Sequence, residues 1–149
     1  MPQAMPTILI AHRDSVFTDR LAADLRRDGY CVVTCPGPVP PANHCIRCQE
    51  GYCPLTQGAD VMVYDPSLTA STPDGGRCNV ALASARAHPD VPMLLAWTPG
   101  TAPDPGTLLS MAEQTPSLHV AAHSAPALLA QVRELLDAAP TRQREAGLS

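Results

Sequence analysis

The chain has 149 residues, the size of one domain, and hydrophobic residues make up 45% of it, an ordinary share for a globular protein. Its formal charge of −4 implies no general phosphate-binding surface, so we expect no direct contact with nucleic acid. No apolar run approaches the roughly 20 residues of a membrane span, and the first residues lack the basic region of a secretory signal. We therefore expect a cytoplasmic protein without a membrane partner.

The first third of the chain predicts a strand, a helix and a second strand. Thr7–Ala11 is a short apolar run with β-branched residues, typical of a buried strand. Asp14 and Ser15 are suitable N-cap residues for a helix that Gly29 ends. Tyr30–Thr34 predicts the second strand.

The middle of the chain predicts two more strands around a helix. Residues 36–58 show no clean period and are rich in proline and cysteine, so we treat them as an insert. Ala59–Asp65 is continuously apolar until its last residue, as strands covered on both faces usually are. A loop over Pro66–Gly76, a helix over Cys78–Ala87 and a strand over Val91–Trp97 follow.

The last third predicts a helix, a strand and a helix. They are expected over Thr107–Gln114, over Leu118–Ala122 and after the N-cap Ser124. Residues 1–139 then form one domain, and residues 140–149 form a flexible tail.

Alternation of strands and helices predicts an α/β domain with a parallel sheet and helices on both faces. Five strands in a chain of this length suit a single flavodoxin-like domain with the strand order 2-1-3-4-5. In that order, functional residues lie beyond the carboxyl ends of strands 1, 3 and 4.

Four segments resemble parts of bacterial response-regulator receiver domains, and together they cover roughly residues 7–139 apart from the insert. ILIAHRDSVFTDRLAADLRRDGYCVVT is similar to the first β-α-β unit, and GADVMVYDPSL to the third strand with its phosphoacceptor aspartate. HPDVPMLLAWT is similar to the fourth strand, and SAPALLAQVRELL to the last helix. The resemblance implies a receiver fold and a role in two-component signal transduction or a phosphorelay.

The resemblance also implies positions for the phosphorylation machinery. Asp65 matches the phosphoacceptor. The Thr or Ser that ends the family's fourth strand falls on Trp97, with Thr98 one residue later. The family's lysine falls near Ala121, but all ten basic residues of this chain are arginine.

The acidic pair that holds Mg²⁺ in this family aligns with His12 and Arg13. Neither is a good ligand for an ion that prefers carboxylate oxygens, so Mg²⁺ is not expected. Asp14 is one residue further on and is expected to cap the helix instead. Asp65 is then expected to pair with His12 or with Arg13, and Arg13 beside it would mimic the charge of a bound metal.

These departures favour an atypical receiver, or pseudo-receiver, that acts as an interaction module without phosphorylation. The alternative is a conventional response regulator that is phosphorylated at Asp65. The sequence offers no candidate pair of a base and a nucleophile, so we do not expect an enzyme. An enzyme on this fold would need a ligand pocket over Asp65. Because no DNA-binding output domain is recognised in the sequence, the module is expected to bind another signalling protein or itself. By resemblance, the binding face is the fourth helix, the fifth strand and the last helix, here Leu118–Ala122 and the exposed side of 125–139.

The insert has the composition of a metal site. Cys45 and Cys48 have the spacing of a metal knuckle, and Cys35 and Cys53 could complete a tetrahedral zinc site, with His44 as a reserve ligand. Zinc is the first candidate and an iron–sulfur cluster the second. A redox-active dithiol and free thiols packed as small hydrophobes remain open.

If the cysteines bind metal or react, the protein is a metal or redox sensor with the insert as its input. Metal binding would also explain how an insert with few apolar residues becomes ordered. The two remaining cysteines, Cys31 and Cys78, are expected in the core, with Cys31 as a further reserve ligand.

Overall fold

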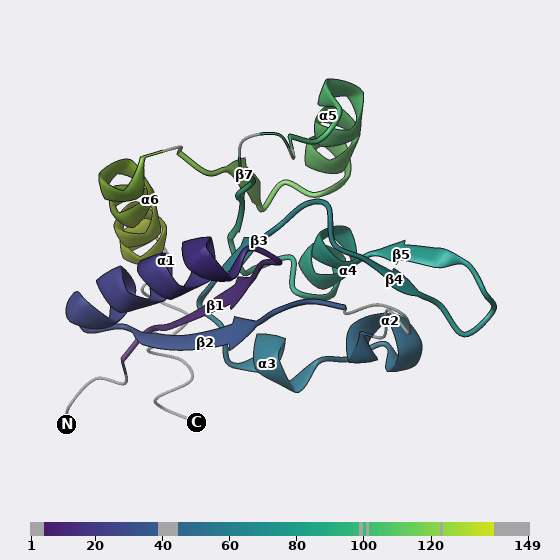
Figure 1. The fold of residues 1–149 in the computed structure, drawn as a ribbon, viewed down its shortest axis with the longest axis horizontal. Helices are drawn as coiled ribbons and strands as arrows, with labels where there is room; N and C mark the ends of the chain where they lie inside the picture. The colour runs from purple at the N-terminus through teal and green to yellow at the C-terminus, as the bar shows by residue number, and fades with distance from the viewer. Residues whose placement is uncertain (1–4, 39–44, 99, 101, 123, 139–149) are drawn as a thin grey trace.

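The computed structural model describes residues 5–38, 45–98, 100, 102–122 and 124–138. Figure 1 shows the order of the elements along the chain. They are β1 (Thr7–Ala11), α1 (Ser15–Arg27), β2 (Cys31–Cys35), α2 (Ile46–Glu50), α3 (Pro54–Gln57), β3 (Val61–Tyr64), β4 (Thr69–Ser71), β5 (Arg77–Asn79), α4 (Val80–Ala87), β6 (Met93–Leu95), α5 (Pro105–Gln114), β7 (Leu118–Val120) and α6 (Ala125–Ala138). The predicted tail, 140–149, and His44 lie outside the described residues.

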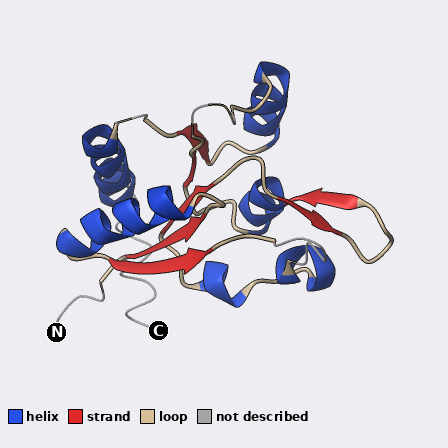
Figure 2. Ribbon diagram, in the orientation of Figure 1, coloured by secondary structure: helices blue, strands red, loops and turns tan. Residues whose placement is uncertain are grey.

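The main sheet has five parallel strands in the order β2-β1-β3-β6-β7. Counted without the hairpin strands β4 and β5, this is the predicted order 2-1-3-4-5, so the flavodoxin-like class is confirmed. Figure 2 shows the strands in red between the helices. Because neighbouring strands are joined by helical crossovers, their carboxyl ends meet at one edge of the sheet.

The alternation of side chains along the strands creates two separate cores. On one face, α1 and α6 cover the side chains of Ile8, Ile10, Val61 and Val63. On the other face, α4 and Met111 of α5 cover the side chains of Leu9, Ala11, Met62 and Tyr64. The central strands are buried on both faces, as their continuous apolar character predicts.

One predicted loop and the start of one predicted helix are wrong. Residues 69–71 and 77–79 form an antiparallel hairpin, β4–β5, and the helix that follows begins at Val80 rather than at Cys78. The helix begins there because the Asn79 side chain accepts a hydrogen bond from the N–H of Leu82 at 2.9 Å and so caps it. Three-residue strands without apolar alternation leave little signal in a sequence.

The insert contains two short helices, α2 and α3, which protein contacts hold in place. A disulfide joins Cys48 of α2 to Cys78 of β5, and Gln49 donates a hydrogen bond to the carbonyl of Ser71 in β4. α2 packs on α4. These contacts hold the described part of the insert against the hairpin and α4. Across the described ranges, no helix combines the length and the apolar composition that a bilayer span requires.

Candidate functional site

Three strand ends place Asp65 at the centre of the carboxyl edge of the sheet. β1, β3 and β6 are neighbours, so the residues that follow them are adjacent. The Asp65 N–H donates to the carbonyl of Ala11 at 2.8 Å, and the Ala96 N–H donates to the carbonyl of Tyr64 at 2.9 Å. Asp65 is 1% exposed, and His12 and Arg13 follow β1 beside it.

Both carboxylate oxygens of Asp65 already have protein partners. Oδ1 accepts hydrogen bonds from the Ser67 N–H, at 2.9 Å, and from the Ser67 hydroxyl. Oδ2 accepts from the Arg13 Nε at 3.1 Å. The Arg13 guanidinium also contacts the Ser67 hydroxyl, so the three side chains form one network. The predicted pairing of Arg13 with Asp65 is confirmed.

Ser67 is the member of this network that the sequence analysis missed. The segment Asp65-Pro66-Ser67 forms a local turn in which the aspartate side chain accepts from the backbone two residues later. The spacing of an Asx turn, with a serine two residues after the aspartate, is the sequence feature that could have predicted the contact between Ser67 and Asp65.

The Asp65 carboxyl is ionised at neutral pH. Burial raises its pKa, but hydrogen bonds from the Ser67 N–H, the Ser67 hydroxyl and the Arg13 guanidinium together outweigh burial and hold its pKa below the ordinary value. The result is a buried carboxylate that is neutralised by a guanidinium.

His12 is neutral and fixed in one tautomer. Its Nε2 lies 3.0 Å from the carbonyl of Ala96, which can only accept, so Nε2 carries the proton. Its Nδ1 accepts from the N–H of Asp14 at 3.0 Å. Burial lowers the pKa of His12 despite the nearby Asp65 carboxylate, whose Oδ2 lies 3.9 Å from Nδ1. His12 therefore positions the β1–α1 turn.

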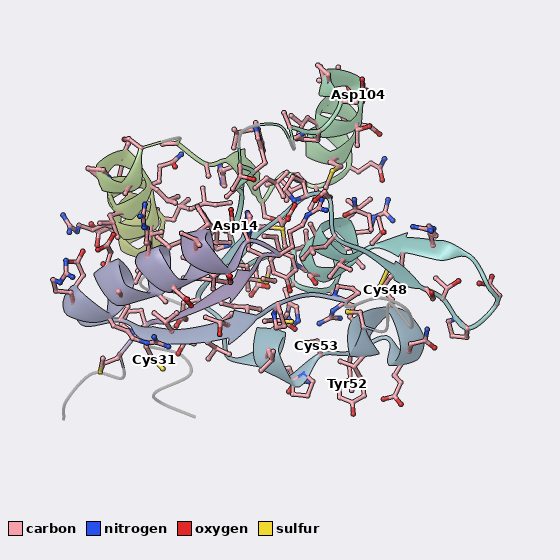
Figure 3. The ribbon with its side chains drawn as sticks, viewed as in Figure 1. Asp14, Cys31, Cys48, Tyr52, Cys53 and Asp104 are labelled. Carbon is pink, nitrogen blue, oxygen red and sulfur yellow. A yellow bond between two sulfur atoms is a disulfide. The ribbon has the colours of Figure 1, made fainter. Side chains whose placement is uncertain are left out.

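Asp14 caps α1, as predicted. Its Oδ1 accepts from the N–H groups of Val16, at 3.0 Å, and Phe17, at 3.1 Å. Figure 3 shows Asp14 at the start of this helix. This carboxylate satisfies helix N–H groups and is not a free metal ligand.

The residues at this edge do not fit Mg²⁺. Both His12 nitrogens and both Asp65 oxygens are engaged, and the Arg13 guanidinium lies where the cation would have to approach. Trp97 and Thr98 follow β6, half-buried, at the positions that the resemblance assigns to the hydroxyl. Ala121 is buried directly after β7, where the resemblance places a lysine. Of the family's constellation, Asp65 is present, and the nearest hydroxyl, that of Thr98, lies one residue beyond the expected position.

The predicted cysteine set is divided between two arrangements. Cys48 is bonded to Cys78, with Cα atoms 6.1 Å apart, so in this structure it is not a thiolate ligand. The prediction of Cys78 as a core residue is wrong, because it is only half-buried and forms this disulfide. Cys35, Cys45 and Cys53 are free thiols that line one cavity. Figure 3 shows Cys48 and Cys53 on the insert and Cys31 at the start of β2, away from them. Cys31 is exposed, which corrects its assignment to the core.

These thiols are not assembled as a metal centre. Among the residues whose placement the structure gives, no group of three or more His, Cys, Asp or Glu side chains is arranged to hold a metal ion. The cavity that the thiols line lies beside the insert and is not lined by Asp65. It is therefore not the pocket that an enzyme centred on Asp65 would need.

Comparisons with solved structures give a consistent answer about the fold. A response regulator receiver domain protein from Clostridium thermocellum matches with a TM-score of 0.59 and 15% identity, over 97% of this chain and 100% of that one. The non-phosphorylated HemR receiver domain from Leptospira biflexa matches with a TM-score of 0.56 and 19% identity, over 88% and 94%. A CheY-like receiver domain protein from Methanospirillum hungatei matches with a TM-score of 0.56 and 14% identity, over 96% and 99%.

No family model and no curated protein matches the sequence. The likeness therefore rests on three-dimensional structure, and it agrees with the strand order and the helical layers. The chain has the fold of response-regulator receiver domains.

Proposed function

We propose that this protein is a signalling module with a receiver fold that works without phosphorylation and acts by binding another protein rather than by catalysis. The observation that carries the proposal is the ion pair between Arg13 and the buried carboxylate of Asp65. The guanidinium neutralises the charge that a metal ion would otherwise neutralise, so the carboxyl edge of the sheet is held in one state.

The chemistry of phosphoryl transfer supports this proposal. The transition state spreads negative charge over the transferred group, and metal ions or cations must neutralise it. Here the acceptor oxygens are hydrogen-bonded to Ser67 and Arg13, the site does not fit Mg²⁺, and the chain contains no lysine. The attacking oxygen would have to leave its partners before it could react.

Treatment with acetyl phosphate and Mg²⁺, followed by intact mass spectrometry, tests the proposal. We expect no phosphate adduct in the wild type and none in Asp65→Asn. A receiver domain of known activity provides the positive control in the same buffer. A phosphate adduct that Asp65→Asn abolishes would instead identify a conventional response regulator.

The partner surface that we propose is the face formed by α5, β7 and α6. It carries two large exposed apolar side chains, Leu109 on α5 at 62% and Val120 on β7 at 51% exposure. Contiguous exposed apolar surface marks contacts with other proteins, and we propose that these two side chains belong to such a surface. The occupant is a second copy of the chain or another signalling protein.

Light scattering of the wild type and of Leu109→Glu/Val120→Glu separates these occupants. A wild-type dimer that the double variant converts to monomer supports self-association. A wild-type monomer points to a different partner. Val16→Glu, an exposed apolar position on α1, is the matched control and is expected to change nothing.

A redox or metal sensor is the second candidate, and the Cys48–Cys78 disulfide favours its redox form. The bond joins the insert to the hairpin, so reduction would remove the covalent link between them and leave the hydrogen bond from Gln49 to Ser71. Titration in glutathione buffers, read by thiol alkylation and mass spectrometry, measures whether the bond opens within a cytosolic range. Metal analysis and an absorption spectrum after anaerobic purification test for zinc or an iron–sulfur cluster at the cysteines.

A further inference from the structure

A cavity of about 180 Å³ lies between the insert and the sheet, away from Asp65. Its walls include Leu9 of β1, Leu55 of α3, Tyr64 of β3 and Val80 of α4, together with the three free thiols. An apolar cavity of roughly 150 Å³ is large enough to hold benzene. The space therefore suits a ligand of about that size rather than a nucleotide.

The wall of this cavity contains a buried arginine, Arg47, which is 7% exposed. Its Nη1 donates to the carbonyl of Gly51 at 3.2 Å, and its Nη2 contacts the Thr56 hydroxyl and lies 3.2 Å from the Nε2 of His88. Its Nε is buried and has no hydrogen-bond partner. The Nε–H donor of the guanidinium is therefore unused.

The charge of Arg47 also lacks a counterion among the described residues. None of the ion pairs that they form involves Arg47, and no Asp or Glu lines the cavity. Burial raises the pKa of the Cys35 thiol and of the Tyr64 phenol, so both groups are neutral at pH 7. A buried cation with an unpaired donor is unfavourable unless something complements it.

The polar groups around Arg47 do not neutralise its positive charge. The Tyr64 hydroxyl accepts a hydrogen bond from the Ser84 hydroxyl at 3.1 Å, and Thr56 donates to the carbonyl of Cys53 at 2.9 Å. These groups are uncharged, so the hydrogen bond that Thr56 accepts from Arg47 does not neutralise the guanidinium. What is missing is an anionic acceptor that can enter an otherwise apolar space.

We propose that this cavity binds a small organic anion, a carboxylate on an apolar body of about the size of benzoate, with the carboxylate on Arg47. Carboxylates accept from guanidinium groups in strong, charge-assisted hydrogen bonds. The apolar body would contact Leu9, Leu55 and Val80. This site goes beyond the proposed function, because it does not use Asp65 and would provide an input to a module that is not phosphorylated.

Binding of sodium benzoate to the full chain, compared with its uncharged isostere benzamide, tests the proposal. We expect benzoate to raise the melting temperature and to bind at least tenfold more tightly than benzamide. In NMR spectra, benzoate should shift the amides of Leu9, Leu55 and Val80. Equal binding of the two compounds, or no binding of either, would overturn the proposal and leave solvent as the partner of Arg47.

Arginine variants provide the second arm. Arg47→Met should lower benzoate affinity at least tenfold, whereas Arg77→Met, an exposed arginine on β5, should leave it unchanged. If Arg47→Met does not fold, the comparison of benzoate with benzamide on the wild type still decides. Shifts confined to the residues around Arg13 and Asp65 would mean that benzoate binds at the carboxyl edge, and the proposal would be wrong.

Discussion

Replacement of Arg13 by methionine is expected to destabilise the protein by about 1–2 kcal/mol at pH 7. The variant leaves the Asp65 carboxylate, which is 1% exposed, without its guanidinium. Breaking a fully buried ion pair costs about 3–5 kcal/mol, whereas an exposed pair contributes at most about 1 kcal/mol. The Arg13 side chain is 54% exposed and Ser67 keeps its hydrogen bonds, so the expected value lies between these limits.

The effect should depend on the charge of Asp65. Because the folded-state pKa of Asp65 is lowered, its ionisation stabilises the fold above the unfolded-state pKa of roughly 3.9, and this stabilisation is lost as the pH falls through the folded-state pKa. The difference between wild type and Arg13→Met should therefore shrink at acid pH. In an Asp65→Asn background at pH 7, Arg13→Met should cost less than about 0.5 kcal/mol.

Urea denaturation of the four proteins in this cycle, with the disulfide intact, measures the coupling between Arg13 and Asp65. The melting temperature of Arg13→Met should fall by about 3–6 °C. Arg20→Met, an exposed position on α1, is the control and should stay within about 0.5 kcal/mol of the wild type. A coupling energy near zero, or a cost that is the same at pH 7 and at acid pH, would refute the argument that Arg13 neutralises Asp65.

Three further predictions concern the disulfide, the buried histidine and the metal. Cys78→Ala removes a bond that joins residues 30 positions apart, and the chain-entropy model gives a loss of stability of about 3.6 kcal/mol. Urea denaturation should show this loss, and the stability of the variant should no longer depend on reductant. A smaller effect of reductant on the wild type than on the variant would contradict it. The pKa of His12 is lowered in the folded state, so the unfolded chain takes up a proton first, and stability should fall as the pH drops below about 6.5. His12→Gln should lose that part of the pH dependence, and an unchanged profile would argue against a neutral buried imidazole. Addition of Mg²⁺ should not change the melting temperature of the wild type, whereas Arg13→Asp, which places a carboxylate beside Asp65, should gain a Mg²⁺-dependent rise; stabilisation of the wild type by Mg²⁺ would show that the site does accept the ion.

Much of the architecture follows from local patterns in the sequence. Apolar runs such as Thr7–Ala11 alternate with amphipathic helical segments, and short right-handed crossovers allow few arrangements of such units. Those rules are sufficient for the five-stranded order and for the place of Asp65 at the carboxyl edge. The cap at Asp14 also follows, because a helix needs an acceptor for its first N–H groups.

Part of the candidate site could also be predicted from the sequence. The absence of lysine can be read directly from the chain, and the resemblance to receivers places Arg13 where that family has an acidic residue. Together they predict that Asp65 pairs with Arg13 or His12, and the structure shows the pair with Arg13.

The rest was decided by tertiary structure, because it depends on surfaces that meet only when distant segments pack together. Cys48 and Cys78 are 30 positions apart, and their pairing follows from the contact between the insert and a hairpin that has no apolar signature. The single tautomer of His12 depends on the carbonyl of Ala96, 84 residues away. An arginine such as Arg47 is usually exposed, so its sequence alone predicts a surface position. Packing of α2 and α3 over the sheet instead buries its guanidinium in the wall of a cavity.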